Sequence, residues 1–332
     1  MDMKKWASDI ILSTQKKALP VLSFPIIQLK GLTVNDFISD AGVQSQCMLD
    51  LTKRVDSYAA LSPMDLSVEA EAFGSDIVMT EGEVPTVTGS IISNKEQAEA
   101  LRVPTPGEGR TGINIRAAEL AAELIDDKPV LAGIIGPFSL AGRLMDVSQA
   151  MLYCYDEPEM VHIVMRKVTD YLIEVSDLYK KAGASGVIMA EPLTGILSPD
   201  MAYEFSMPYV KEIVDAVQSD EFIFVYHNCG NNTPHMTEGI YGLGAKAYHF
   251  GNAVDMEKML DDAPDNVIVM GNVNPAEILN GTPETVAAET RTLLEKCGRY
   301  NNFVPSSGCD IPPKSPWENI DAFFSTVNEF YK

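Results

Sequence analysis

The chain alternates short apolar runs with longer amphipathic segments. The short runs are rich in β-branched and aromatic residues, which favours strands. From the middle of the chain they are PVLAGIIG (129–136), SGVIMAE (185–191), FIFVYHN (222–228), AKAYHFG (245–251), NVIVMGN (266–272) and NNFVPSS (301–307). Strand, helix and strand in succession, with strands that are apolar throughout, predict a parallel sheet covered on both faces.

The amphipathic segments predict the intervening helices. Residues 157–182 place an apolar side chain on one face at each helical turn, and the segment ends in KKAGA. Positive charge and a glycine are favoured at the carboxyl end of a helix. Further helices are expected over 200–218, 255–262, 283–297 and 316–330.

Two earlier segments, PVLSFPI (20–26) and the stretch around PMDLSVEA (63–70), bring the expected strands to eight, the number that closes a (β/α)₈ barrel. DIVMTEG (76–82) and TVTGSII (86–92) predict a small inserted β-hairpin near the N-terminal third. We therefore predict an α/β fold: a single (β/α)₈ TIM barrel domain over residues 1–332. An open doubly wound sheet is the alternative, disfavoured because no glycine-rich phosphate turn follows the first strand.

Composition narrows the functional classes. With 46% hydrophobic residues the chain can bury a substantial core, and 25 basic against 47 acidic residues give a net charge of −22. That charge disfavours nonspecific binding to nucleic acid or anionic membranes. No run reaches the roughly 18 apolar residues of a membrane-spanning helix. The five cysteines and the lack of a recognisable targeting signal lead us to expect reduced thiols and a cytoplasmic protein.

A His-x-Cys pair carries the clearest chemistry. His227 and Cys229 follow the expected strand at 222–228, and Cys309 follows the last expected strand. The carboxyl ends of barrel strands meet at one rim, so these residues are expected to lie together. An imidazole and two thiolates bind Zn²⁺ tetrahedrally and leave one position open for chemistry. The sequence therefore predicts a catalytic zinc site.

Other candidates are weaker. Glu191 and His249 each end an expected strand, and Asp65 lies in SPMDLSVEA. A carboxylate beside zinc could fill the fourth position at rest or accept a proton from an incoming thiol, and His249 could orient a ligand. The alternative for each carboxylate is a helix cap or an ion pair. The remaining thiols are expected in the core: Cys47, Cys154 and Cys297.

Four segments resemble signature blocks of one family. They are GIIGPFSLAGRL (133–144), AEPLTGILSP (190–199), VMGNVNPAEILNGTPETV (269–286) and GCDIPPKSPWENIDAFF (308–324). The chain is similar there to the uroporphyrinogen decarboxylase superfamily. That resemblance implies a single (β/α)₈ barrel, and it leaves function open because the superfamily holds decarboxylases and corrinoid-dependent methyltransferases.

Two features separate those activities. The decarboxylases carry an arginine-bearing segment near the N-terminus, whereas FPIIQLKGLT (24–33) has no arginine. Asp65 matches the segment that holds the decarboxylase aspartate and does not discriminate. His227, Cys229 and Cys309 resemble, residue by residue, the zinc ligands of the methylcobamide:coenzyme M methyltransferase branch, which the metal-free decarboxylases lack.

The resemblance implies a zinc-dependent enzyme that moves a methyl group from a methylated corrinoid such as methylcobalamin, carried by a partner corrinoid protein, to a small thiol. Coenzyme M is the favoured acceptor, and its sulfonate requires a basic residue: Lys30, Arg143 or Lys246. The alternatives are a decarboxylase that uses Asp65, methyl transfer to tetrahydrofolate or homocysteine, and a non-catalytic corrinoid-binding protein.

Overall fold

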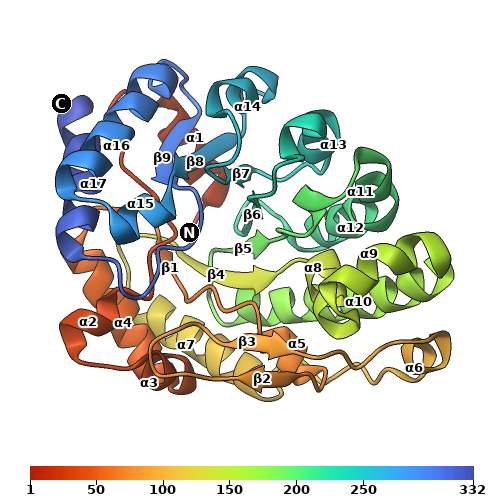
Figure 1. The fold of residues 1–332 in the computed structure, drawn as a ribbon. Coiled ribbons are helices and arrows are strands. Elements are labelled where there is room, and N and C mark those ends of the chain that lie inside the picture. The colour runs from red at the N-terminus through yellow and green to blue at the C-terminus, as the bar shows by residue number, and fades with distance from the viewer.

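A parallel sheet of seven strands forms the centre of the protein (Figure 1). The computed structural model describes all residues, 1–332. Adjacent strands follow the order β1-β4-β5-β6-β7-β8-β9, and every neighbouring pair is parallel. The strands are β1 (Ala60–Leu61), β4 (Val130–Ile135), β5 (Gly186–Ala190), β6 (Ile223–Asn228), β7 (Ala247–Phe250), β8 (Ile268–Val273) and β9 (Phe303–Ser307). The fold is α/β and TIM-barrel-like.

Helices surround the sheet and connect its strands (Figure 1). Before β4 they are α1 (Met3–Leu12), α2 (Ile26–Lys30), α3 (Val34–Ser39), α4 (Ala41–Arg54), α5 (Val68–Ala72), α6 (Lys95–Ala100) and α7 (Arg110–Leu124). After β4 they are α8 (Pro137–Met145), α9 (Val147–Asp156), α10 (Pro158–Lys181), α11 (Pro199–Phe205), α12 (Met207–Val217), α13 (Thr237–Gly242), α14 (Met256–Asp262), α15 (Pro275–Asn280), α16 (Pro283–Cys297) and α17 (Trp317–Phe330). Short 3₁₀ helices lie at η1 (Thr194–Ile196) and η2 (Thr233–His235). No helix is both long and apolar enough to cross a membrane.

The six strands expected after residue 129 are confirmed, as are the helices expected at 157–182, 255–262, 283–297 and 316–330. The helix expected over 200–218 is wrong in one respect, because it breaks at Ser206 (φ −126°, ψ −59°) into α11 and α12. Pro208 explains the break, since it lacks an amide hydrogen and cannot continue a helix from the preceding turn.

The first early strand prediction is wrong, and the second is displaced along the chain. Residues 20–26 form no strand, and 63–70 enter α5, while the short strand β1 lies just before that segment at Ala60–Leu61. Pro20 and Pro25 interrupt the first segment and Pro63 follows β1. Proline has no amide hydrogen to donate to a sheet ladder, so apolar character alone could not make these segments strands.

Residues 18–21 occupy the gap between the two edges of the sheet without forming a strand. The Leu19 amide donates to the Pro305 carbonyl of β9 at 2.9 Å, and the Tyr58 amide donates to the Ala18 carbonyl at 3.3 Å. The Ile311 amide donates to the Val21 carbonyl at 2.9 Å. The segment thus joins β9 to the residues that lead into β1, and it lies beside the loop after β9.

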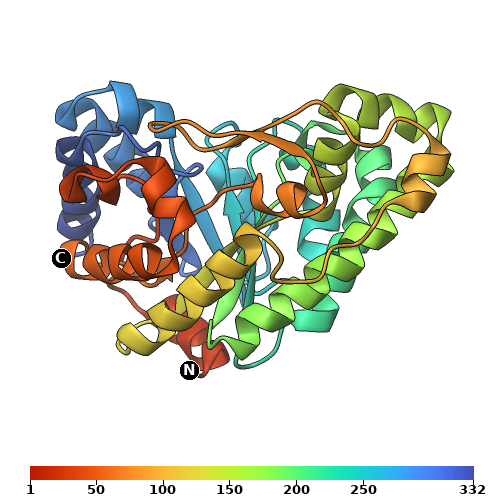
Figure 2. The same cartoon turned by 90° about the horizontal axis from the view of Figure 1, so that it is seen from below.

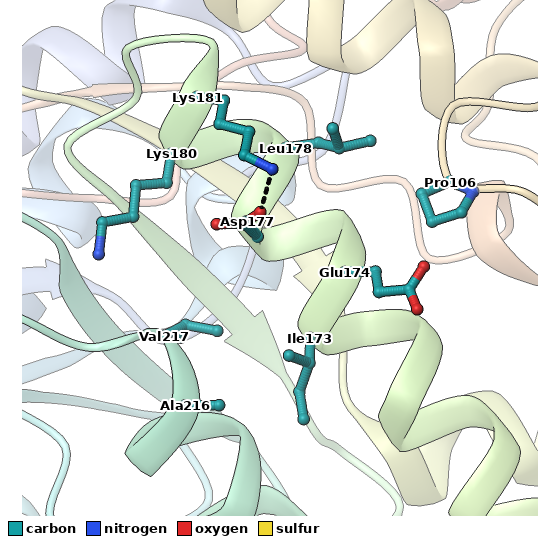
Figure 3. Close-up of a pocket in the computed structure, with 9 residues that line it drawn as sticks. All are labelled: Pro106, Ile173, Glu174, Asp177, Leu178, Lys180, Lys181, Ala216 and Val217. Atoms are coloured by element: carbon teal, nitrogen blue, oxygen red, sulfur yellow. Dashed lines mark ion pairs between the residues drawn. The ribbon is translucent and has the colours of Figure 1, made fainter.

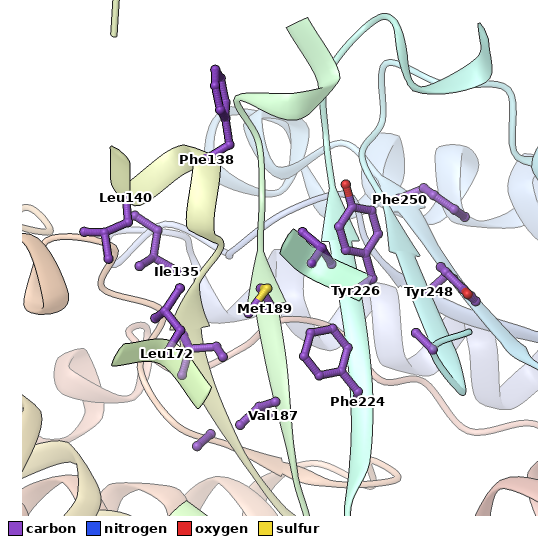
Figure 4. Packing of buried hydrophobic residues seen from close by; sticks show 14 of the residues in the cluster. Ile135, Phe138, Leu140, Leu172, Val187, Met189, Phe224, Tyr226, Tyr248 and Phe250 are labelled. Atoms are coloured by element: carbon purple, nitrogen blue, oxygen red, sulfur yellow. The ribbon is translucent and has the colours of Figure 1, made fainter. Parts of the chain in front are cut away.

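Alternate residues of each strand face two different cores. Val187, Met189, Phe224 and Tyr226 pack outward against the helices (Figure 4), whereas residues of the opposite parity form a second cluster inside the curved sheet. The inner cluster includes Ile188, Ala190, Ile223, Val225, Ala247, Met270 and Val304. Successive side chains of a strand point to opposite faces, so burial of both faces makes each strand apolar throughout.

A further pair of strands lies outside this sheet. β2 (Asp76–Val78) and β3 (Thr86–Thr88) pair antiparallel, with Asp76 opposite Thr88. Figure 2 shows the orange segment that carries them crossing one end of the fold, while the N-terminus and α1 lie at the other end. This segment contributes the residues that cover the cavity described below.

Close strand packing yields a test of the fold. Gly186 begins β5, and a Cβ there would lie 2.3 Å from the Ile223 carbonyl oxygen. We expect Gly186→Ala to lower the free energy of unfolding by about 2–4 kcal/mol, because the backbone of β6 cannot yield easily. Gly242→Ala is the control, since a Cβ there meets nothing within 4 Å. Equal stability of the two variants in urea denaturation would contradict the packing.

Candidate metal-binding active site

Three potential metal ligands converge at the carboxyl ends of the strands. His227 belongs to β6, Cys229 follows that strand, and Cys309 lies in the loop after β9. One ligand atom from each residue lies within 4.8 Å of the others, and Cys309 Sγ is 3.7 Å from His227 Nε2. Curvature of the sheet brings together residues that are far apart in sequence.

The donor set fits a tetrahedral zinc ion. Bond lengths of about 2.3 Å to sulfur and 2.0 Å to nitrogen place tetrahedral ligand atoms roughly 3.5–3.8 Å apart. The distance between Cys309 Sγ and His227 Nε2, 3.7 Å, lies in that range. Imidazole and thiolate are the ligand types that suit zinc, and three of them leave a fourth position for another molecule.

A chain of buried hydrogen bonds orders the His227 ring. The Ser306 hydroxyl donates to the Leu19 carbonyl at 2.7 Å, because a carbonyl can only accept. Ser306 Oγ lies 2.8 Å from His249 Nε2, and His249 Nδ1 lies 2.6 Å from His227 Nδ1. With its proton committed to Leu19, the Ser306 oxygen accepts from His249 Nε2.

The direction of these bonds fixes both imidazole tautomers. Burial lowers the pKa of His249 well below its usual value, so its ring is neutral and carries one proton, on Nε2. Its Nδ1 must then accept the Nδ1 proton of His227. The lone pair of His227 Nε2 is left facing Cys309, which is the form that a metal requires.

The loop that carries Cys229 is held by Asn228 and by a close glycine contact. Asn228 Oδ1 accepts from the Gly230 amide at 2.9 Å and from the Thr233 hydroxyl at 3.0 Å. A Cβ on Gly251 would lie 2.5 Å from Cys229 Cβ. The end of β7 can approach the Cys229 loop this closely only because residue 251 has no side chain.

The two thiols influence one another's ionisation. The neighbouring Cys309 lowers the pKa of Cys229, whereas Cys229 and burial raise the pKa of Cys309 to about 12. In the metal-free protein Cys229 is therefore the sulfur that loses its proton more readily. Both residues are partly exposed to the cavity that they line.

The ligands open into a cavity of about 490 Å³. Its wall is mostly apolar, and the segment around β3 supplies part of it. Arg143 of α8 and Asp310, next to Cys309, are its only Arg, Lys, Asp or Glu side chains. The complete lining is Val21, Met64, Leu66, Val84, Pro85, Thr86, Val87, Arg143, Val147, Ala190, Pro192, His227, Cys229, Cys309 and Asp310.

The sequence patterns missed Ser306 and Asp310. Asp310 Oδ1 is buried without a hydrogen-bond partner, and burial raises the pKa of this carboxyl well above its usual value. The sequence could have indicated Asp310, because this residue directly follows the predicted ligand Cys309. Ser306 had a similar signal, because it lies in β9 at the parity of the inward-facing Val304.

Glu191 lies close in sequence to cavity residues yet faces elsewhere. It is fully buried and accepts hydrogen bonds from the Phe138 amide at 2.9 Å and the Ser139 amide at 2.8 Å. It therefore caps α8 from the end of β5. Burial raises the pKa of this carboxyl to about 7, although the amide donors at the start of the helix partly oppose that shift. Gly136 makes room, since a Cβ there would lie 2.3 Å from Glu191 Oε2. Glu191 is not part of the ligand cluster.

Asp65 is held in a buried ion pair. One oxygen pairs with Arg110, and the other accepts the Ser67 amide at 3.0 Å and the Ser67 hydroxyl at 2.6 Å. Asp65 does not line the cavity. The three cysteines expected in the core are buried: Cys47, Cys154 and Cys297.

A second hollow, of about 520 Å³, lies on the outside of the protein between α10 and α12 (Figure 3). Its charged residues sit on the last turns of α10, where Lys181 pairs with Asp177 at 2.6 Å. It contains no histidine or cysteine. The ligand set therefore singles out the cavity at the carboxyl ends of the strands.

Glu69 gives the protein a pH-dependent stability. Its side chain is buried on α5, its Oε2 has no hydrogen-bond partner, and burial raises its pKa to about 7. An unfolded glutamate has a pKa of about 4.3. The folded state therefore binds more protons than the unfolded state between these values, and stability falls as pH rises through that window.

We expect Glu69→Gln to remove this contribution. Relative to the native chain, the variant should gain roughly 1–3 kcal/mol in unfolding free energy between pH 5 and pH 8. Urea denaturation at both pH values measures the difference. Glu123→Gln, at an exposed position, should follow the native chain. A Glu69→Gln variant with an unchanged pH slope would contradict this assignment.

Comparison with known proteins places the fold and the family. A model of the uroporphyrinogen decarboxylase (URO-D) family matches residues 21–330. The methylcobamide:CoM methyltransferase MtbA of Methanosarcina acetivorans is 28% identical over 278 residues, 81% of this chain and 78% of the relative. The uroporphyrinogen decarboxylase of Pseudoalteromonas translucida is 25% identical over 306 residues, 89% and 86% of the two chains.

A solved structure described as a methyltransferase from Methanosarcina mazei has the same fold. It superposes with a TM-score of 0.87 at 22% identity, covering 100% of this chain and 99% of the other. Relatives with two different activities thus match at similar identity. Choice between those activities depends on the residues of the site.

Proposed function

This chain belongs to the uroporphyrinogen decarboxylase family, and on that premise we propose that it is a zinc-dependent methyltransferase. In this proposal it moves a methyl group from a methylated corrinoid to a thiol, with coenzyme M as the favoured acceptor. The observation that carries the proposal is the convergence of His227, Cys229 and Cys309 on one cavity. Relatives named methylcobamide:CoM methyltransferase support it.

His227, Cys229 and Cys309 would hold the zinc ion, and their geometry fits it. Zinc bound there would lower the pKa of a thiol at its open position, so that the sulfur is a nucleophilic thiolate at neutral pH. The protein contributes by orienting His227 through His249 and Ser306. The mostly apolar wall of the cavity would limit the access of water to the reacting sulfur.

Methyl transfer joins the substrate sulfur to the methyl carbon and breaks the carbon–cobalt bond. The electron pair of that bond stays on the corrinoid, and the thiol proton is released. The corrinoid must therefore reach the cavity that the three ligands line. We propose that a separate corrinoid protein presents it there, and that the complex acts in the cytoplasm.

The rival decarboxylase function is less well supported. A decarboxylase that uses Asp65 would need its carboxylate in the cavity, whereas Asp65 pairs with Arg110 and does not line the cavity. The segment 24–33 also lacks the arginine of the decarboxylases. The thiol cluster in turn has no use in metal-free decarboxylation.

Loss of either thiolate should remove metal and activity together. We expect Cys229→Ser and Cys309→Ser to bind less than about a tenth of the zinc held by the native protein, because a serine hydroxyl is a poor ligand for zinc. Elemental analysis measures the metal, and absorbance of methylcobalamin follows demethylation with coenzyme M. Cys154→Ala is the control, since that thiol is buried away from the cavity.

The acceptor panel separates the alternatives. Homocysteine and tetrahydrofolate are tested beside coenzyme M, and cobalamin binding without turnover on any acceptor would favour a non-catalytic binding protein. Full methyl transfer by a zinc-free Cys309→Ser variant would refute the proposed function.

Removal of the Ser306 hydroxyl should weaken zinc binding without removing a ligand. In Ser306→Ala nothing enforces the tautomer of His249, and we expect zinc affinity to fall roughly 10- to 100-fold, as for other groups that orient a ligand. Competition with a chromogenic chelator measures it. Ser176→Ala is the matched control, because that buried hydroxyl also donates to a carbonyl at 2.7 Å but lies on α10. Equal affinity in both variants would show that the hydrogen-bond chain does not support the metal.

A further inference from the structure

We propose that Arg143 binds an anionic group of the thiol substrate, so that the cavity selects thiols carrying a sulfonate or carboxylate. This inference rests on the proposed function and adds the residue that recognises the substrate. Arg143 lies on α8 and lines the same cavity as His227, Cys229 and Cys309. The guanidinium group and the candidate metal ligands therefore line the same cavity.

Arg143 differs from every other arginine of the chain. Each of the others lies within ion-pair distance of a carboxylate: Arg54, Arg102, Arg110, Arg116, Arg166, Arg291 and Arg299. Arg143 makes no ion pair and no hydrogen bond. In a protein with a net charge of −22, an arginine without a partner is unexpected, and it lies in the cavity.

Burial outweighs the effect of the nearby acidic groups on Arg143, and none of those groups uses its donors. Glu191, Glu69 and Asp65 act on it through space, while burial lowers its pKa. Glu191 accepts its hydrogen bonds from α8 amides, and Asp65 from Arg110 and Ser67. The guanidinium is thus partly desolvated and keeps its N–H groups free, a state that an anion in the cavity would relieve.

The other two basic candidates lie elsewhere. Lys30 pairs with Asp50 on α4. Lys246 directly precedes β7, at the amino end of the strands, and lines a different hollow together with Met3 and Asp220. Of the three residues considered for anion binding, only Arg143 reaches the cavity of the thiol cluster.

The chemistry of the guanidinium defines the ligand. Its planar fork donates two parallel hydrogen bonds to the oxygens of a carboxylate, sulfonate or phosphate. Within this cavity such an anion belongs either to the thiol acceptor or to the nucleotide phosphate of the corrinoid. We assign it to the acceptor, because Arg143 lines the same cavity of about 490 Å³ as the ligand sulfurs, and that volume suits a small molecule.

Kinetics with paired thiols tests the assignment. We expect the native enzyme to use 2-mercaptoethanesulfonate with a kcat/KM roughly 10- to 100-fold above that for uncharged 2-mercaptoethanol, with methylcobalamin as donor. In Arg143→Gln that ratio should fall towards one, through KM for the anionic thiol, and Arg143→Lys should be intermediate. Lys30→Gln and Lys246→Gln are the matched controls and should keep the native ratio.

Each outcome decides a different point. If Arg143→Gln loses the same factor with both thiols, Arg143 serves the corrinoid or the fold, and the assignment is refuted. A native enzyme that methylates no thiol refutes the proposed function instead. Calorimetry with ethanesulfonate, which has no thiol, then tests the anion site alone: we expect binding to the native protein and none to Arg143→Gln. Equal binding by both proteins would overturn the inference.

Discussion

A series of hydrogen bonds inside the curved sheet connects the segment between the two sheet edges, residues 18–21, to the candidate metal ligand His227. It begins at the Leu19 carbonyl and passes through Ser306 and His249 to the ring of His227. Leu19 belongs to the segment that joins the two edges of the sheet, and its amide contacts β9. Because each of these hydrogen bonds has a single direction, the contacts that join the two edges of the sheet also select the tautomer of His227.

Charge distribution complements this ordering. The protein is strongly acidic, and its arginines are ion-paired except for Arg143 in the cavity. Glu191 caps the helix that carries Arg143, so a buried carboxylate positions α8 rather than taking part at the thiol cluster. A small anionic substrate would therefore meet one cation, Arg143, in a cavity that also holds an apolar wall, the ligand sulfurs and Asp310.

Alternate residues of a strand face opposite sides of the sheet, and this alternation explains which of the predicted site residues lie at the site. Val225 faces inward in β6, and His227 shares that parity, as His249 does with Ala247 in β7. In β5 the inward residue is Ala190, so Glu191 points outward to α8. A period of two is legible in the sequence, and counting it from the apolar positions would have separated Glu191 from His227.

Sequence alone determined the later six strands, four of the longer helices beside them and the ligand types, because hydrophobic periodicity and side-chain chemistry are local properties. Only the tertiary structure decided that residues 18–21 close the sheet without a strand, that Ser306 orders two histidines, and that Asp65 is held by Arg110. It also decided that Arg143 has no partner. These features depend on which groups meet across strands distant in sequence, and that is set by the register and curvature of the folded sheet.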